Sequence, residues 1–557
     1  METSLTWLIV IGSFVISALV AQRLRIATPI MFLLGGIMLS LIPGMKPIAI
    51  APEYMLLLFL PPILMEAAFF TSIRDFRKNL RPILFMAIGL VIVTSVAVAG
   101  TLVALLPGAT LALGMLLGAI ISPPDAAAAT SALKHVRIPK RIQTILEGES
   151  LVNDASGLIL FQFAVIAIVT GAFSWSDAAT DFAWMVVGGA AIGWVFARLF
   201  VWIHPHINEP SIAILTTFIP PYAAFMLANE VHASGVIAVV VAGLVVGWHA
   251  AEIFTPKFRM PAEIIWKMVV FFLNALAFTL IGLNFIPLLE GLKAYDPWQV
   301  TALVAAVCAV CVLVRFVYVF GVAYGQRALS PKLRARDPYP PWQNVFVISW
   351  CGMRGVVTLA TALAIPFTLA DGSAFPHRDL LLFTALCVIL FTLVIQGISL
   401  PWLLRKLTLS FDPKLVQEEW LARVQGARQA LQKLDELAMD SSIHLPALSR
   451  IRSHYEERLE SLGDGPNTPL YASETPQLAN HPILQAENRI WRDVLAMEQQ
   501  AIIRLRKEFH ISDDVMHELF REIDLLASRF HYVEESPLAP AEQKRAAWRA
   551  RLFKRAA

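Results

Sequence analysis

Charged residues are scarce in this sequence. Asp, Glu, Lys and Arg make up 16% of its 557 residues, whereas about 25% is usual in soluble domains. Hydrophobic residues make up 57%, and the mean hydropathy is +0.63. The formal net charge of +3 is too small to indicate a nucleic-acid partner. The composition therefore excludes an ordinary soluble domain and predicts a membrane protein.

Cysteine is also scarce. The four cysteines, Cys308, Cys311, Cys351 and Cys387, all fall in apolar segments. The first two form a CxxC, but no second pair and no clustered histidines accompany it. Such thiols usually pack as small hydrophobic side chains, so the pattern argues against a disulfide framework or a resident metal site. We expect no cofactor.

Long apolar runs, by contrast, are abundant. A membrane helix needs about 20 mostly apolar residues. Thirteen segments qualify, roughly at 5–21, 28–43, 54–70, 82–106, 110–132, 146–171, 183–203, 210–229, 233–249, 265–290, 299–324, 343–369 and 380–404. The first run lacks a basic flank before it and a small-residue cleavage site after it, so we expect a retained span and not a signal peptide. The sequence predicts an all-α polytopic membrane protein with about thirteen transmembrane helices.

Positive charges concentrate in alternate loops between these segments. Seventeen Lys and Arg residues fall in the odd-numbered loops, against three in the even ones: Lys46, Lys293 and Arg378. Because positively charged loops stay in the cytoplasm, we expect the N-terminus outside and the C-terminus in the cytoplasm.

Charge returns after the last predicted span. Residues 409–557 hold 20 of the 45 Lys and Arg and 23 of the 42 Asp and Glu. We therefore expect a membrane domain, 1–408, and a cytoplasmic helical domain, 409–557. The segments EEWLARVQGARQALQKLDELA and SDDVMHELFREIDLLASRF have helical spacing, the second with Ser512 as candidate N-cap. The final KRAAWRARLFKRAA suits either a basic amphipathic helix on anionic membrane lipids or a solvated tail.

Ionisable residues inside a membrane span are functional candidates, because each costs about 2.5–3.5 kcal/mol to insert. The mid-span positions are Glu66, Asp125, Glu149, Asp154, Lys267, Arg315 and Arg354. Arg315 lies near the cytoplasmic end of its span, and we expect it to extend its charge to the interface.

The segment EGESLVND, 147–154, concentrates polar groups in one predicted helix. Ser150 and Asp154 are four residues apart and share a face, while Glu149 and Asn153 share the neighbouring one. A hydroxyl and a carboxylate are hard oxygen ligands suited to a small cation. The pattern predicts a cation site at Asp154; the alternative is a set of acids neutralised by hydrogen bonds within the bundle.

Two of the predicted spans carry interruptions. In IISPPDAAAAT two prolines directly precede Asp125, which removes two backbone donors and should break the helix near mid-membrane. In SWCGMRGVVTLATALAIP, Gly352 and Gly355 lie on either side of Arg354. Paired broken helices indicate a transporter with inverted repeats and a site at the membrane midplane. Two merely kinked helices are the alternative.

The order of segments carries a family resemblance. LPPILMEAAF, SPPDAAAA, LEGESLVNDASG, EVHASGVIAVVVAGL, FFLNALAFTLIGL and GMRGVVTLATALAIP together resemble the sodium/proton exchangers of the monovalent cation:proton antiporter family, over essentially all of 1–408. The tail resembles that of a bacterial subgroup. The resemblance implies a thirteen-span homodimer in a bacterial inner membrane, with a dimerisation domain and a mobile core in which spans five and twelve cross.

The resemblance also implies an ion site. Asp154 matches the shared cation and proton site, Asp125 and Ser150 contribute to the ion pocket, and Glu66 lies near the ion path. The usual fifth-span motif is Thr-Asp-Pro, whereas Pro124 precedes the acid here. A hydroxyl ligand is therefore missing, although the carbonyl of Pro124 could coordinate.

The resemblance extends to three further positions around that site: Glu149, Asn153 and Arg354. Glu149 matches the acid that pairs with the twelfth-span arginine, here Arg354, and stabilises the core. Asn153 matches the asparagine that marks electroneutral exchangers. Lys267 departs from the family, since many relatives carry an acid there.

The function implied is secondary active exchange of Na+ for H+, electroneutral and one for one, and not enzyme catalysis. Burial disfavours a charged carboxylate and a bound cation favours it, so Asp154 can hold either a proton or a metal ion. The partners are protons and Na+, K+ or Li+. A K+/H+ antiporter is the nearest alternative, followed by a cation channel or non-transporting sensor. An aspartyl protease using Asp125 and Asp154 has only the two acids in its favour.

Overall fold

The computed structural model describes residues 3–24, 27–42, 51–126, 138–171, 175–254, 256–369, 372–407, 413–438 and 445–463. Within these ranges every regular element is a helix, apart from one isolated β-bridge between Thr368 and Ala374. The chain divides into two compact units, 1–411 and 412–557. We describe each unit separately.

The first unit contains the apolar helices. In its first half these are α1 (Thr3–Leu24), α2 (Thr28–Ser40), α3 (Pro52–Phe70), α4 (Ile73–Lys78), α5 (Leu80–Leu84), η1 (Phe85–Leu90), α6 (Val91–Leu105), α7 (Leu111–Ile121), α9 (Lys140–Thr170), α10 (Trp175–Ile203) and η2 (His204–His206). In its second half they are α11 (Pro210–Thr216), α12 (Ile219–Glu230), α13 (Gly235–Ile253), α14 (Pro256–Leu283), α15 (Phe285–Gly291), η3 (Leu292–Ala294), α16 (Pro297–Phe320), η4 (Gly321–Gly325), α17 (Gln326–Leu329), α18 (Pro331–Arg336), α19 (Trp342–Trp350), α20 (Val356–Leu363), α21 (Arg378–Phe391), η5 (Thr392–Gln396) and α22 (Gly397–Lys406).

Many of these helices could cross a membrane. Eight helical stretches in the described residues are long and apolar enough: Thr6–Leu24, Leu80–Leu105, Lys140–Thr170, Ala179–His206, Pro210–Glu230, Pro261–Leu283, Pro297–Leu329 and Arg378–Lys406. Four shorter apolar helices accompany them: Thr28–Ser40, Tyr54–Phe70, Leu111–Ile121 and Gly235–Ala250. Each of the thirteen predicted segments overlaps a helix or a run of consecutive helices. The all-helical polytopic class is confirmed.

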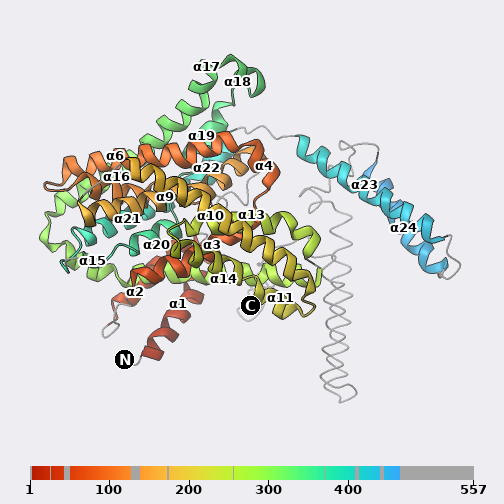
Figure 1. Ribbon diagram of the computed structural model, residues 1–557, viewed down its shortest axis with the longest axis horizontal. Helices are drawn as coiled ribbons and strands as arrows, with labels where there is room; N and C mark the ends of the chain where they lie inside the picture. The colour runs from red at the N-terminus through yellow and green to blue at the C-terminus, as the bar shows by residue number, and fades with distance from the viewer. Residues whose placement is uncertain are drawn as a thin grey trace, which may run out of the picture. The chain divides into compact units, whose positions relative to one another are not determined.

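Two groups of helices make up the first unit. In one, α2 packs on α14, α3 on α13, and α10 on α12 and α13. In the other, α6 packs on α7 and α16, and α7 on α9. Figure 1 shows α6, α16 and α9 in the upper part of the view and α3, α14 and α2 below them. The short helix α20 contacts both groups, through α3 and α14 on one side and α7 and α21 on the other.

Glycines allow the closest helix crossings. A Cβ on Gly36 of α2 would overlap the carbonyl oxygen of Thr279 in α14, and one on Gly118 of α7 would overlap the backbone of Ser95 in α6. Small residues at such crossings let the backbones approach, which is how membrane helices gain packing energy without a hydrophobic driving force between them.

An ion-pair cluster of Arg141, Arg327 and Asp337 links three segments at one end of the second group. The two terminal nitrogens of Arg141, near the start of α9, each donate to one oxygen of Asp337 at 2.9 Å, and Arg327 of α17 donates to the same carboxylate at 2.5 Å. Burial raises the pKa of the Asp337 carboxyl, but the hydrogen bonds and charges of the two arginines outweigh it and hold the pKa below its usual value. This ion-pair cluster holds the start of α9, the helix that carries the predicted ion site.

The second unit is a pair of amphipathic helices in its described part. They are α23 (Pro413–Ala438) and α24 (Leu445–Leu462), so the first predicted tail helix is confirmed. Trp420 donates from Nε1 to the carbonyl of Leu462 at 3.1 Å, and Arg452 pairs with Asp435 at 2.6 Å. The predicted helix that begins near Ser512 and the basic C-terminal segment lie outside the described residues.

Candidate functional site

The helix α9 carries the predicted cluster. Glu149, Asn153 and Asp154 are buried, Asp154 with 7% of its surface exposed, and Ser150 is half-buried. The helix is unbroken through this segment, so the predicted four-residue spacing holds. Because the side chains have few routes to water, their hydrogen bonds must come from neighbouring helices.

The first neighbour is the broken end of α7. The helix ends at Ile121 and residues 122–125 are not helical, as the two prolines predicted. The amide of Asn153 donates to the carbonyl of Pro124 at 3.0 Å, and the hydroxyl of Ser150 accepts from the backbone N–H of Ala126 at 3.1 Å. Side chains of α9 thus form hydrogen bonds with backbone groups that have no helical partner because α7 is broken there. Residues 127–137, the rest of the predicted fifth span, lie outside the described residues.

The second neighbour is the gap between α19 and α20. The first of these helices ends at Trp350 and the second begins at Val356, which confirms the predicted interruption. The backbone N–H of Asp125 donates to the carbonyl of Met353 at 2.7 Å, and Nε of Arg354 donates to the carbonyl of Ile121 at 2.9 Å. The two broken segments therefore cross and supply each other's missing hydrogen-bond partners, which irregular backbone at membrane depth requires.

Charges at the crossing complement the ends of the half-helices. The carboxylate of Asp125 lies against Gly355, directly before the first residue of α20, where the N-terminal end of the helix dipole favours an anion. The guanidinium of Arg354 lies at the C-terminal end of α7, where the dipole favours a cation. Asp154 is close enough to Asp125 for their charges to interact. The crossing thus brings together the two acids that were predicted from separate spans.

The partner of Glu149 is not the one expected. Arg315 of α16 donates to both of its oxygens, Nη1 to Oε1 at 2.6 Å and Nη2 to Oε2 at 3.0 Å. The side chains of Glu149 and Arg315 are 1% and 2% exposed, so the expectation that Arg315 reaches the interface is wrong as well. Arg354 instead binds the backbone carbonyls of Ile121 and Gly352. Since α16 packs on α19, Arg315 reaches the helix break directly and also donates to the carbonyl of Ile348.

The sequence contained a signal for this pair. Arg315 was already among the mid-span ionisable residues, and such a residue requires a buried counter-charge. Nothing in its spacing along the chain, however, said which acid that would be.

Two predicted positions lie apart from the crossing. Glu66, near the end of α3, is half-buried and lines a cavity with residues of α13 and α14. Lys267 lies on the exposed side of α14, where its Nζ contacts Oε1 of Glu263 at 2.6 Å. The lysine therefore remains at the surface, as its amphipathic stem permits.

The oxygen atoms at the crossing suit a weakly held cation. In the described residues no cluster of three or more His, Cys, Asp or Glu side chains could hold a resident metal. The crossing instead presents the carboxylates of Asp125 and Asp154, the hydroxyl of Ser150 and the carbonyl of Pro124. The side-chain oxygen of Asn153 is buried and has no hydrogen-bond partner among the residues described. Hard oxygen ligands of this kind favour alkali ions over softer metals.

Two broken helices that meet beside a buried and a half-buried carboxylate are typical of secondary transporters. Residues 9–406 match the family model described as sodium/hydrogen exchanger, transmembrane. An uncharacterized Na+/H+ exchanger of Mycobacterium tuberculosis is 33% identical, with 92% of this chain and 94% of that protein covered. A sodium, potassium, lithium and rubidium/H+ antiporter of Bacillus subtilis is 29% identical over 94% of this chain and 78% of its own length.

A solved structure shares the fold of this chain. The sodium proton antiporter MjNhaP1 of Methanocaldococcus jannaschii matches with a TM-score of 0.55 at 18% identity, over 71% of this chain and 100% of that one. The chain belongs to the sodium/hydrogen exchanger family. The predicted family and Na+/H+ antiport are thereby confirmed, and the protein is a transporter and not an enzyme.

The contact between Asp125 and Gly355 leads to a first prediction. A Cβ at position 355 would overlap the carboxyl group of Asp125, whereas the backbone there is extended and tolerates alanine. We expect Gly355→Ala to displace the carboxylate and to lower the rate of Na+/H+ exchange by at least about tenfold, a cost of about 1.4 kcal/mol. Gly100→Ala is the matched control, because nothing lies within 4 Å of its added Cβ. Equal exchange rates for the two variants in proteoliposomes would contradict the contact.

Proposed function

We propose that the protein exchanges one Na+ for one H+ without net charge movement, with Asp154 as the shared site. Asp125, Ser150 and the carbonyl of Pro124 complete the ion pocket. The observation that carries the proposal is the position of Asp154, buried on α9 beside Asp125 at the crossing. A carboxylate at that depth is stabilised by one proton or by one cation, and the two compete.

The charges around the crossing support electroneutral exchange. Glu149 and Arg315 neutralise each other in a buried bidentate pair. Of the remaining three charges, Arg354 balances Asp125 when both are ionised, which leaves Asp154 as the net charge. Binding one proton or one monovalent cation cancels it equally. If the site moves between the two sides of the membrane only when it is loaded and neutral, exchange must be one for one.

The proposed cation follows from the names of the family and of a relative. The family model names sodium, and the Bacillus subtilis relative is named for sodium, potassium, lithium and rubidium. Oxygen ligands alone do not rank these ions, because cavity size and dehydration cost also enter. We propose Na+ as the principal substrate, with Li+ transported and K+/H+ exchange as the alternative.

The finer architecture is also part of the proposal. We propose thirteen spans with inverted repeats, an N-terminus outside and a C-terminus in the cytoplasm, a homodimer, and a bacterial inner membrane as the location. The excess of basic residues in alternate loops supports the orientation. Glu66 lies near the ion path in this arrangement, and residues 409–557 form a helical regulatory domain.

Proteoliposomes loaded with a pH-sensitive dye test the proposal. A proton gradient is imposed, and Na+, Li+ or K+ is then added with the membrane potential clamped at different values. We expect saturable, Na+-dependent dissipation of the gradient at a rate that does not change with the clamped potential. A rate that follows the potential would contradict the one-for-one stoichiometry, and a response to K+ alone would favour the alternative substrate.

A further inference from the structure

The neutral oxygen atoms proposed for the ion pocket also have structural contacts. The hydroxyl of Ser150 accepts from the backbone N–H of Ala126 at 3.1 Å, and the carbonyl of Pro124 accepts from the amide of Asn153 at 3.0 Å. The position directly before Asp125 is a proline, which has no side-chain oxygen. Hard cations in proteins are commonly bound by about six oxygen atoms. Besides the two carboxylates, a cation there would therefore need further neutral ligands.

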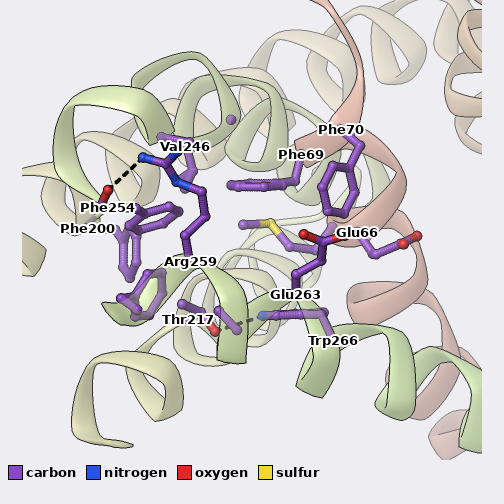
Figure 2. A pocket seen from close by; sticks show the side chains of 15 residues that line it. Glu66, Phe69, Phe70, Phe200, Thr217, Val246, Phe254, Arg259, Glu263 and Trp266 are labelled. Carbon is purple, nitrogen blue, oxygen red and sulfur yellow. Dashed lines mark hydrogen bonds between the residues drawn. The ribbon is translucent and has the colours of Figure 1, made fainter. Parts of the chain in front are cut away.

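Two oxygen-bearing side chains of the predicted third and fifth spans make other contacts. The hydroxyl of Ser122 accepts from that of Ser95 in α6 at 3.3 Å. Glu66 of α3 lines a separate cavity of about 340 Å³, and Figure 2 shows it among the aromatic side chains there, which include Phe69 and Phe70. Among the described helices at the crossing, α20 offers the next candidate.

Thr358 of α20 directs its hydroxyl at the broken end of α7. It is the third residue of its helix and is 2% exposed. Its Oγ1 donates to the carbonyl of Pro123 at 3.5 Å, whereas O–H···O bonds usually measure about 2.5–3.0 Å. A hydroxyl that donates its proton retains two acceptor lone pairs. This long hydrogen bond therefore leaves Thr358 able to coordinate a cation.

Thr361, one turn further along α20, uses its hydroxyl differently. It donates to the carbonyl of Val357, four residues earlier in the same helix, at 2.8 Å. This is a common arrangement for threonine within a helix. The equivalent carbonyl for Thr358 is that of Arg354, which precedes the first residue of α20. The hydroxyl of Thr358 reaches the neighbouring segment because it lies in the first turn after the helix break.

The segment 123–125 lies next to both α9 and α20. A Cβ on Gly157 of α9 would overlap the ring of Pro123, and Gly157 is three residues after Asp154, on the same helix face. Toward α20, the carboxylate of Asp125 lies against the residue that precedes the helix. The segment thus adjoins the face of α9 that carries Asp154 and the first turn of α20, which carries Thr358.

We propose that the hydroxyl of Thr358 and the carbonyl of Pro123 bind the transported cation beside Asp125, and that Thr358 raises the affinity for it. The inference rests on the proposed function and adds a ligand from α20. Oxygen ligands lie about 2.4 Å from a cation the size of Na+ or Ca²⁺, and two of them at right angles are about 3.4 Å apart. The 3.5 Å between these two oxygen atoms is close to that spacing. Both ligands are neutral, so they favour the cation over the proton without changing the one-for-one charge balance.

Na+ titrations of the full-length protein test this ligand. The half-saturating Na+ concentration is measured for exchange in proteoliposomes and for the rise in melting temperature in detergent. Thr358→Val removes the hydroxyl at similar shape, and we expect it to raise that concentration about tenfold, with the maximal exchange rate retained. Thr358→Ser keeps the hydroxyl and should stay within about twofold of the wild type. Thr361→Val is the matched control, because its hydroxyl is used within its own helix.

Thr358→Cys separates coordination from a purely structural role. Its thiol can still donate a weak hydrogen bond to Pro123, but soft sulfur is a poor ligand for an alkali ion, so this variant should resemble Thr358→Val. An unchanged half-saturating concentration in Thr358→Val, or an equal rise in Thr358→Ser, would overturn the inference. A lower melting temperature as the sole effect would overturn it too, because Thr358 would then only join the broken helices. Where Thr358→Val does not fold, Thr358→Cys decides by the same criterion.

Asp154→Asn in the same titrations separates this inference from the proposed ion site. A Na+-dependent rise in melting temperature that persists in Asp154→Asn would count against the shared site itself. Loss of that rise, combined with wild-type Na+ affinity in Thr358→Val, would count against Thr358 alone.

Discussion

Replacing Asp154 with Asn is expected to abolish Na+-dependent proton exchange while the protein remains folded. Asparagine has nearly the same shape, but it neither binds a proton at physiological pH nor supplies the charge that holds a cation. The carboxylates of Asp154 and Asp125 repel each other when both are ionised, so removing the charge of Asp154 costs the folded state no attraction between these two groups. Flux in dye-loaded proteoliposomes should fall to the level of protein-free vesicles.

The control for this experiment is a surface acid. Glu290 lies at the exposed end of α15 and pairs loosely with Lys293 at 3.8 Å, so Glu290→Gln should exchange at the wild-type rate. Thermal melts of the purified Asp154→Asn protein separate loss of function from loss of fold. Residual Na+-dependent flux in this variant would place the shared site elsewhere. A melting temperature well below that of the wild type would show that Asp154 acts as a structural residue.

The candidate ion site was predictable to the extent that it depends on local backbone chemistry. Two prolines before Asp125 and two glycines around Arg354 predicted both helix breaks, because the loss of backbone donors and of helix propensity acts within a few residues. The helical spacing of Ser150 and Asp154 likewise placed them on one face. These expectations required only the identity of neighbouring residues.

The pairing of Glu149 could not be predicted in this way. Arg315 is 166 residues away in sequence, and its contact depends on how α16 packs against α19, which in turn contacts α9. The position of Arg315 near the end of its span suggested that its charge lies at the interface, and family resemblance favoured Arg354. The two arginines have different partners in the structure. Arg315 neutralises Glu149, whereas Arg354 binds backbone carbonyls at the helix breaks. Tertiary packing therefore determines which charged residues form an ion pair.

The same pair should dominate the stability of the core. Glu149→Gln or Arg315→Met leaves one buried charge without its partner, which typically costs about 3–5 kcal/mol. We expect each variant to melt at a much lower temperature than the wild type, with exchange retained by whatever protein remains folded. The double variant should recover part of the loss, because no isolated charge is then buried.

A double-mutant cycle distinguishes this pair from the expected one. If Glu149 and Arg315 are partners, their coupling energy should be large, about 1.5–3 kcal/mol as for contacting residues. Glu149 and Arg354 should couple more weakly, since Arg354→Met removes hydrogen bonds to the carbonyls of Ile121 and Gly352 and leaves the ion pair intact. The reverse order of coupling energies, measured by thermal unfolding in detergent, would restore Arg354 as the partner. It would also add the charge of Arg315 to the balance around Asp125 and Asp154, on which the proposed one-for-one stoichiometry depends.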